Sequence, residues 1–188
     1  MTNFEFVFSL FGLLLGLALA QLLGGFGRAL QTRHRIRIGW LTPMLGLIVA
    51  LDVTSFWTFA WEVRNALTPH FFVLICCFAV TGLYYLVARL VFPDEPTEWP
   101  DYDVYFFRHK KLVLGGVLAC NLLAAAGQFA LGYDPYSQHI FVIVSAVFVP
   151  LVILSIVAKG RLWNTIFLGL LLAQYPVLSL YSMLIKAG

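Results

Sequence analysis

Charged side chains are scarce in this sequence. Asp, Glu, Lys and Arg together make up 11% of its 188 residues, whereas a soluble domain carries about 25%. Hydrophobic residues make up 61%, and the mean hydropathy is +0.89. A soluble core of this length has no room for so much apolar surface. The composition therefore excludes a soluble globular protein and predicts one that uses lipid as its solvent.

Long polar stretches are also missing. The longest runs from Pro93 to Lys111 and is far shorter than the roughly 40 residues below which domains rarely fold unaided. We therefore expect one membrane domain over residues 1–188. The first apolar run lacks a basic start and a small-residue cleavage site, so we expect a retained helix rather than a signal peptide. The three cysteines all lie within apolar runs, which argues against a disulfide scaffold.

Motifs of the common enzyme classes are absent. The sequence has no phosphate-binding loop, nucleophile elbow, HExxH, CxxC or paired catalytic carboxylates. The basic residues form no continuous surface with aromatic ones, which argues against nucleic acid as a partner. We expect a protein that is not an enzyme and that needs no cofactor.

Six apolar runs approach or exceed the roughly 20 residues that cross the hydrocarbon core of a bilayer. They predict an all-α, polytopic transmembrane helix bundle, with residues 93–111 as a cytoplasmic loop. The predicted spans are Phe4–Phe26, Trp40–Trp61, His70–Phe92, Leu112–Leu131, Ile140–Ala158 and Asn164–Leu184.

The basic residues predict the orientation of the bundle. Four lie around the first connection between spans, four around the third and two around the fifth, while only Arg64 and Lys186 lie on the other side. Cytoplasmic loops carry the excess of Lys and Arg. Both termini are therefore predicted to be non-cytoplasmic, and the localisation that we expect is a bacterial inner membrane.

The spans also suggest an internal repeat of three helical hairpins. The odd-numbered spans begin alike, at Phe4–Val7, His70–Val73 and His139–Val142. Each even-numbered span carries a polar residue near its middle. The alternative is chance, because apolar helices match one another easily.

Asp52 is the most informative residue of the sequence. An ionised carboxylate near mid-membrane costs at least about 2.5 kcal/mol on insertion scales, so Asp52 should face the bundle interior and be protonated, paired or hydrated. Ser55 shares its helix face, and Asn121 and Gln174 lie at similar depth. We predict an intramembrane polar site from these four residues. It would serve as a proton or cation site or, alternatively, as hydrogen-bonded contacts between helices.

Small residues recur at strict four-residue spacing along the first span, at Gly12, Gly16, Ala20 and Gly24. This glycine face predicts a close helix contact, with a second copy or with another membrane protein as partner. Pro150 and Pro176 fall inside the fifth and sixth spans, where each removes one backbone hydrogen bond and predicts a kink.

His70 and His139 are the only candidate metal ligands, and they are weak ones. They lie at the predicted outer ends of two spans, and no carboxylate or thiolate pattern accompanies them. The Asp101-Tyr102-Asp103 triplet matches a metal-binding DxD pattern, but a three-residue match is too short to identify an enzyme. We expect no metal.

The leading hypothesis is a channel, carrier or proton or cation pathway centred on Asp52. The alternative is a non-catalytic accessory or scaffold subunit of a larger membrane complex, joined through the glycine face. A haem-binding or lipid-modifying enzyme is the least supported reading. The lipid bilayer is the partner common to all three.

Overall fold

The computed structural model describes residues 3–64, 70–130, 132 and 139–187. Over these residues the chain forms six α-helices and one short 3-10 helix, η1, and the predicted all-α fold is confirmed. The helices are α1 (Asn3–Thr32), α2 (Leu41–Glu62), α3 (Phe71–Val91), η1 (Pro96–Glu98), α4 (Tyr102–Ala130), α5 (His139–Val157) and α6 (Arg161–Ala187).

Five of these helices, α1 to α4 and α6, are long and apolar enough to cross a membrane, and α5 has a shorter apolar stretch, Phe141–Val157. The protein is therefore an integral, multi-pass membrane protein. Two helices extend well beyond the apolar runs that predicted them. α1 continues to Thr32, and α4 begins at Tyr102 rather than near residue 112. Residues 102–111 of the predicted loop are thus helical, because their polar side chains find partners on neighbouring segments.

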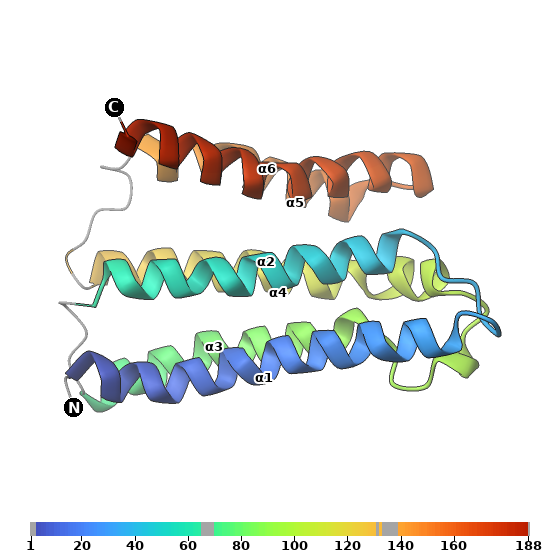
Figure 1. Cartoon of the computed structure of the whole chain (residues 1–188), viewed down its shortest axis with the longest axis horizontal. Helices are drawn as coiled ribbons and strands as arrows, with labels where there is room; N and C mark the ends of the chain where they lie inside the picture. The colour runs from blue at the N-terminus through green and yellow to red at the C-terminus, as the bar shows by residue number, and fades with distance from the viewer. Residues whose placement is uncertain (1–2, 65–69, 131, 133–138, 188) are drawn as a thin grey trace.

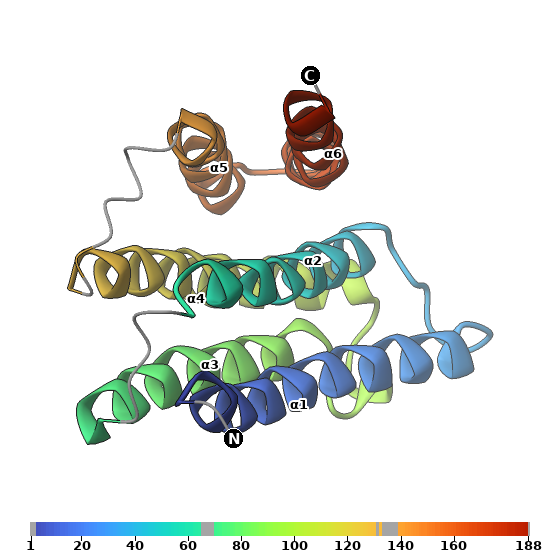
Figure 2. The ribbon, with the colours of Figure 1, turned by 60° about the vertical axis from the view of Figure 1, so that its left-hand side comes forward.

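The helices lie in three layers of two (Figures 1 and 2). α1 packs most extensively against α3, α2 lies beside α4, and α5 pairs with α6. The start of α1 and the end of α6 lie at one end of the bundle, called here the terminal end, and the α1–α2, α3–α4 and α5–α6 connections lie at the other, the loop end (Figure 1). This arrangement follows from an even number of helices that alternate in direction.

The first two hairpins are placed alike, and the third is not. The chain crosses from the first layer to the second both between α1 and α2 and between α3 and α4, whereas α5 and α6 form a layer together (Figure 2). The equivalent helices of the first two hairpins, α1 with α3 and α2 with α4, therefore lie side by side. The third hairpin packs on this four-helix unit through α2 and α4.

Close contact between the first two layers depends on glycines outside the predicted glycine face. The rings of Phe26 and Phe92 meet edge to face with centroids 4.8 Å apart. A Cβ at Gly46 would lie 2.9 Å from the Phe26 ring, and one at Gly25 would overlap Phe92. Small residues let helix backbones approach closely, and here they make room for two aromatic rings.

The glycines of the predicted glycine face make no close contact with another helix among the described residues. A Cβ at Gly16 would meet nothing within 4 Å, and one at Gly12 or Gly24 would meet only side chains of α1 itself. Gly16, Ala20 and Gly24 are exposed on the outside of the bundle.

Replacement of Gly25 by Ala should destabilise the protein by about 1–3 kcal/mol, because the added methyl group displaces Phe92. Gly27→Ala on the same helix is the matched control, since a Cβ there meets nothing within 4 Å and alanine is the better helix former. Thermal unfolding in detergent measures both variants. Equal melting temperatures for the two would show that the Phe26–Phe92 contact does not limit stability.

Candidate functional site

Asp52 lies on α2 where four helices meet, and it is 3% exposed. Its carboxylate accepts hydrogen bonds from the side chains of three other helices. The Tyr84 hydroxyl of α3 donates to Oδ2 at 2.9 Å, and the Tyr175 hydroxyl of α6 donates to Oδ1 at 3.2 Å. The Asn121 amide of α4 donates to both oxygens, at 3.0 and 3.2 Å. The structure thus brings two of the four predicted polar residues, Asp52 and Asn121, together.

The amide orientation of Asn121 is fixed by a second contact. Its Nδ2 also donates to the backbone oxygen of Val117 at 3.0 Å, so both neighbours of this nitrogen are acceptors. Asp52 therefore faces hydrogen-bond donors from all three neighbouring helices. A carboxylate anion only accepts, and hydrogen bonds to it are stronger than those between neutral groups.

This coordination fits a proton better than a metal cation. Hard cations such as Ca²⁺ bind six or more oxygen ligands, whereas Asn121 presents its nitrogen to Asp52. Both oxygens of Asp52 are already engaged by N–H and O–H groups. Among the described residues, no group of three or more His, Cys, Asp and Glu side chains is arranged to hold a metal ion.

The site is closed toward the loop end. One to two turns in that direction, the helices around it contribute fully buried aliphatic side chains, namely Leu45, Ile48, Val49, Leu114 and Val117. In the other direction it meets Phe56, whose ring packs edge-on against Tyr84 with centroids 5.5 Å apart. The carboxylate therefore has an apolar seal on one side and an aromatic ring on the other.

The other two predicted members, Ser55 and Gln174, do not contribute to the hydrogen bonds of the carboxylate among the described residues. The Ser55 hydroxyl donates to the backbone oxygen of Asp52 at 2.7 Å. Gln174 is buried, and its Oε1 has no hydrogen-bond partner among the described residues. The neighbouring residue of α6, Tyr175, reaches Asp52 instead. Pro150 and Pro176 lie inside α5 and α6, as their spans predicted.

Sequence reasoning missed Tyr84 and Tyr175. The two tyrosines lie at the depth of Asp52, which is the only signal that the sequence offers for them. Tyrosine is common in membrane helices, especially near their ends, and a hydroxyl on an aromatic ring does not stand out as a polar residue does. Depth alone does not select them, because Tyr85 lies beside Tyr84 at almost the same depth.

A second charged group, Lys110, is buried at the loop end and is only 3% exposed. Its Nζ donates to the backbone oxygens of Ser155 at 2.8 Å and Ala158 at 2.6 Å, and to Oδ1 of Asn164 at 2.9 Å. These three acceptors match the three protons of an ammonium group. They include carbonyls at the C-terminal end of α5, where a cation is also favoured by the helix dipole.

Asn164 completes this contact from α6. Its Nδ2 donates to the backbone oxygens of Ala158 at 3.1 Å and Gly160 at 2.7 Å. Gly160 has a φ of +98°, a conformation that glycine adopts without strain. Lys110 and Asn164 therefore hold the α5–α6 turn against α4. In the sequence, Lys110 is one of the basic residues that predict the orientation of the bundle. In the structure, it also holds helices together.

The two aspartates of the DxD triplet are paired with a cation. Arg161 Nη2 lies 3.2 Å from Asp101 Oδ2, and Arg161 Nε lies 3.1 Å from Asp103 Oδ2. Asp103 Oδ1 also accepts a hydrogen bond from the backbone N–H of Leu41 at 3.4 Å. These contacts join the three loop-end connections to one another.

Among the described side chains, no histidine joins a group that could hold a metal ion. His70 is exposed at the start of α3, and His139 is the first residue of α5, with its side chain outside the described part of the structure. His109 stacks on Tyr105 with ring centroids 4.1 Å apart.

We expect Lys110→Met to loosen the α5–α6 turn and to lower stability by about 2 kcal/mol or more, because it removes charge-assisted hydrogen bonds and leaves buried acceptors unpaired. The matched control is Lys111→Met, since Lys111 is exposed. Limited proteolysis at the α5–α6 turn and thermal unfolding are the measurements. The capping role is contradicted if the two variants are cleaved and melt alike.

Comparison with known proteins found no relative of this chain. No protein-family model, curated protein or solved structure matches the chain. The chemistry of the site therefore rests on its own residues.

Proposed function

We propose that the protein is a small, non-enzymatic membrane carrier in which Asp52 binds and releases a proton. The observation that supports this is the burial of an ionisable carboxylate at the meeting point of α2, α3, α4 and α6. Ionisable residues inside membrane spans mark ion and proton pathways more often than they serve packing alone.

The partners of Asp52 suit both protonation states. Facing the anion, the hydroxyls of Tyr84 and Tyr175 donate. A protonated carboxyl has one O–H to donate, and a tyrosine hydroxyl accepts as well as donates. The site therefore takes up or releases a proton by rotation of hydroxyl groups, without loss of its hydrogen bonds.

A carrier fits the surroundings of the site better than an open channel does. One to two turns toward the loop end, buried aliphatic side chains separate Asp52 from the polar groups at that end. A channel needs a continuous pathway, whereas a carrier opens to one side at a time. With the basic loops in the cytoplasm, the closed half would be the cytoplasmic half of a bacterial inner-membrane protein, with both termini outside.

Proteoliposomes that enclose a pH-sensitive dye test this proposal. An imposed membrane potential should drive proton entry through the wild-type protein, and Asp52→Asn should abolish it, because an amide does not titrate. The variant should still fold, since the amide keeps one oxygen acceptor and the tyrosine hydroxyls also accept. Asp94→Asn, at an exposed carboxylate of the α3–α4 connection, is the control and should leave the flux unchanged.

Two results would count against the carrier. One is a wild-type flux no greater than that of protein-free liposomes, and the other is an unchanged flux in a folded Asp52→Asn variant. Tyr84→Phe gives an independent check, because loss of the closest donor should shift the pH at which flux is half-maximal.

A second candidate function is that of an accessory or scaffold subunit that associates through the glycine face of α1. The supporting observation is that a Cβ at Gly16 would meet nothing within 4 Å, while Leu13 and Leu17 beside it are exposed. Glycines on membrane helices typically serve close contacts with another helix. On this proposal, the face that the chain leaves uncovered is covered by a second copy.

Gly16→Leu should then dissociate an oligomer in mild detergent, because a leucine side chain prevents close approach of two α1 helices. Gly82→Leu on α3 is the matched control, since a Cβ there also meets nothing within 4 Å. The mass of the detergent-solubilised particle, with detergent subtracted, is the measurement. A monomeric wild-type protein that co-purifies with no partner would rule out association through this face.

A further inference from the structure

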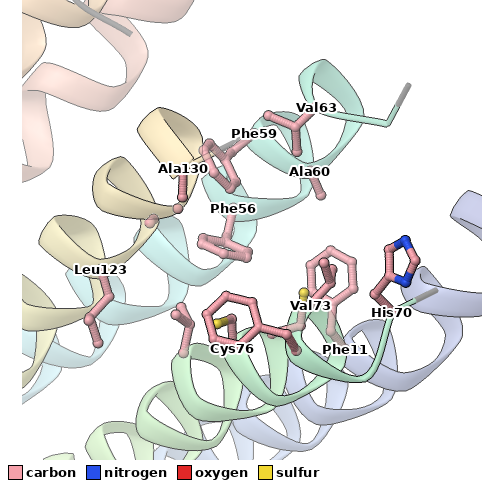
Figure 3. A pocket seen from close by; sticks show the side chains of 15 residues that line it. Phe11, Phe56, Phe59, Ala60, Val63, His70, Val73, Cys76, Leu123 and Ala130 are labelled. Carbon is pink, nitrogen blue, oxygen red and sulfur yellow. The ribbon is translucent and has the colours of Figure 1, made fainter. Parts of the chain in front are cut away.

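A cavity of about 470 Å³ lies toward the terminal end, beside the Asp52 site. All four helices of the first two layers line it. Phe56 and Phe59 come from α2, Val73 and Cys76 from α3, and Leu123 from α4 (Figure 3). Phe11 of α1 also lines the cavity. Ligand sites in proteins have volumes of about 300–1,000 Å³, so the cavity is large enough for a substantial part of a small molecule.

The walls of the cavity are almost entirely apolar. Aromatic and aliphatic side chains make up nearly all of them, and His70 is the only residue among them with a charged or strongly hydrogen-bonding side chain. Apolar cavities of this kind stay dry and take up apolar ligands. Water or an ion is therefore excluded as the preferred occupant, and a hydrocarbon is favoured.

The mouth of the cavity opens between α3 and α4. Phe72 and Cys76 of α3 and Leu123 and Gly127 of α4 line the cavity and are exposed. They belong to two apolar helices that are long enough to cross a membrane. The medium that such a side opening meets is the bilayer, whose interior consists of hydrocarbon chains.

Depth distinguishes this cavity from an ordinary lipid-facing surface. Phe11, Ala60 and Val80 line it and are buried, and they come from three different helices. A chain that enters between α3 and α4 therefore contacts the second and first layers as well as the rim. Lipid at a flat helix face touches exposed side chains only.

We propose that this cavity binds one hydrocarbon chain of a membrane lipid, which enters from the bilayer between α3 and α4. The polar end of that lipid would lie near His70, at the terminal end of the cavity (Figure 3). The chain is the linear acyl chain of a phospholipid or the branched isoprenoid chain of another membrane lipid, and both present only hydrocarbon to the walls. This site goes beyond the proposed proton carrier and does not depend on it.

The cavity adjoins the Asp52 site through two residues. Phe56 lines the cavity and packs against Tyr84, the closest donor to Asp52. Val80 lines the cavity one helical turn before Tyr84 on α3. A bound chain therefore presses on the ring that separates it from the carboxylate, and the occupancy of the cavity and the position of Tyr84 are linked.

Photo-crosslinking in phosphatidylcholine nanodiscs tests the proposal. One arm contains a small fraction of phosphatidylcholine with a diazirine on an acyl chain, and the other contains a diazirine-bearing polyprenyl alcohol. Crosslinks should concentrate at residues 72–80 and 123–130, several-fold above those at the exposed leucines Leu13 and Leu17 of α1. The arm that labels identifies the source of the chain.

Gly127→Leu should lower this labelling several-fold, because its side chain occupies the mouth and a Cβ there meets nothing within 4 Å. Gly115→Leu, equally open on the same helix but outside the cavity, should leave labelling unchanged. Ala124→Phe fills the same cavity from another position and serves if Gly127→Leu does not fold. Labelling that is uniform over all exposed faces, or that survives both filling variants, would mean annular lipid only and would overturn the proposal.

Discussion

The meeting of four helices at one carboxylate is the contact on which the rest of the bundle depends. Inside a bilayer, apolar helix faces gain little by leaving lipid for one another, so packing and interhelical hydrogen bonds select the arrangement. Asp52 is a group that lipid cannot solvate. Its three donors from α3, α4 and α6 therefore determine which faces of these helices turn inward. The surrounding aliphatic side chains then pack between the helix faces that turn inward.

The same contact unites structure and proposed chemistry. Among the described residues, the Asp52 carboxylate is bound only by neutral donors. These hydrogen bonds join the helices, and the carboxylate stays titratable because no paired cation holds it in the charged form. Lys110 shows the contrasting case. Its ammonium group is held by acceptors that match its protons one for one, and it sits where a helix end favours positive charge. Compared with Lys110, Asp52 is the group better suited to change its protonation state.

The sequence predicted the helices themselves better than it predicted which helices pack together. Apolar length indicated all six helices, and the cost of a buried charge indicated that Asp52 turns inward and meets Asn121. Neither rule shows which helices pair. α1 lies against α3 because Gly25 accepts Phe92, a fit of shapes between residues far apart in the chain. The glycine spacing that was visible in sequence, from Gly12 to Gly24, points outward instead.

Sequence patterns did not identify the tyrosines that bind Asp52 or the packing role of Lys110. Tyr84 and Tyr175 are two of eight tyrosines, and only the third dimension distinguishes them from the others. Lys110 reads as a loop cation until α4 is seen to begin at Tyr102. Polar residues that continue a helix past the hydrocarbon are invisible to a count of apolar length. They fix the loop end of this molecule.

In the third hairpin, α5 and α6, polar contacts fix the position of helices that otherwise pack through apolar surfaces. Apolar surfaces tolerate sliding and rotation, because one methyl group replaces another at little cost. Lys110 attaches the α5–α6 turn at the loop end, and Tyr175 attaches α6 at the depth of Asp52. One such contact would leave the hairpin free to rotate against α2 and α4. Two contacts at different depths fix its tilt and its position along the bundle. The hairpin is thus held at the loop end by Lys110 and at mid-depth by Tyr175, and only the second attachment involves the carboxylate proposed to bind a proton.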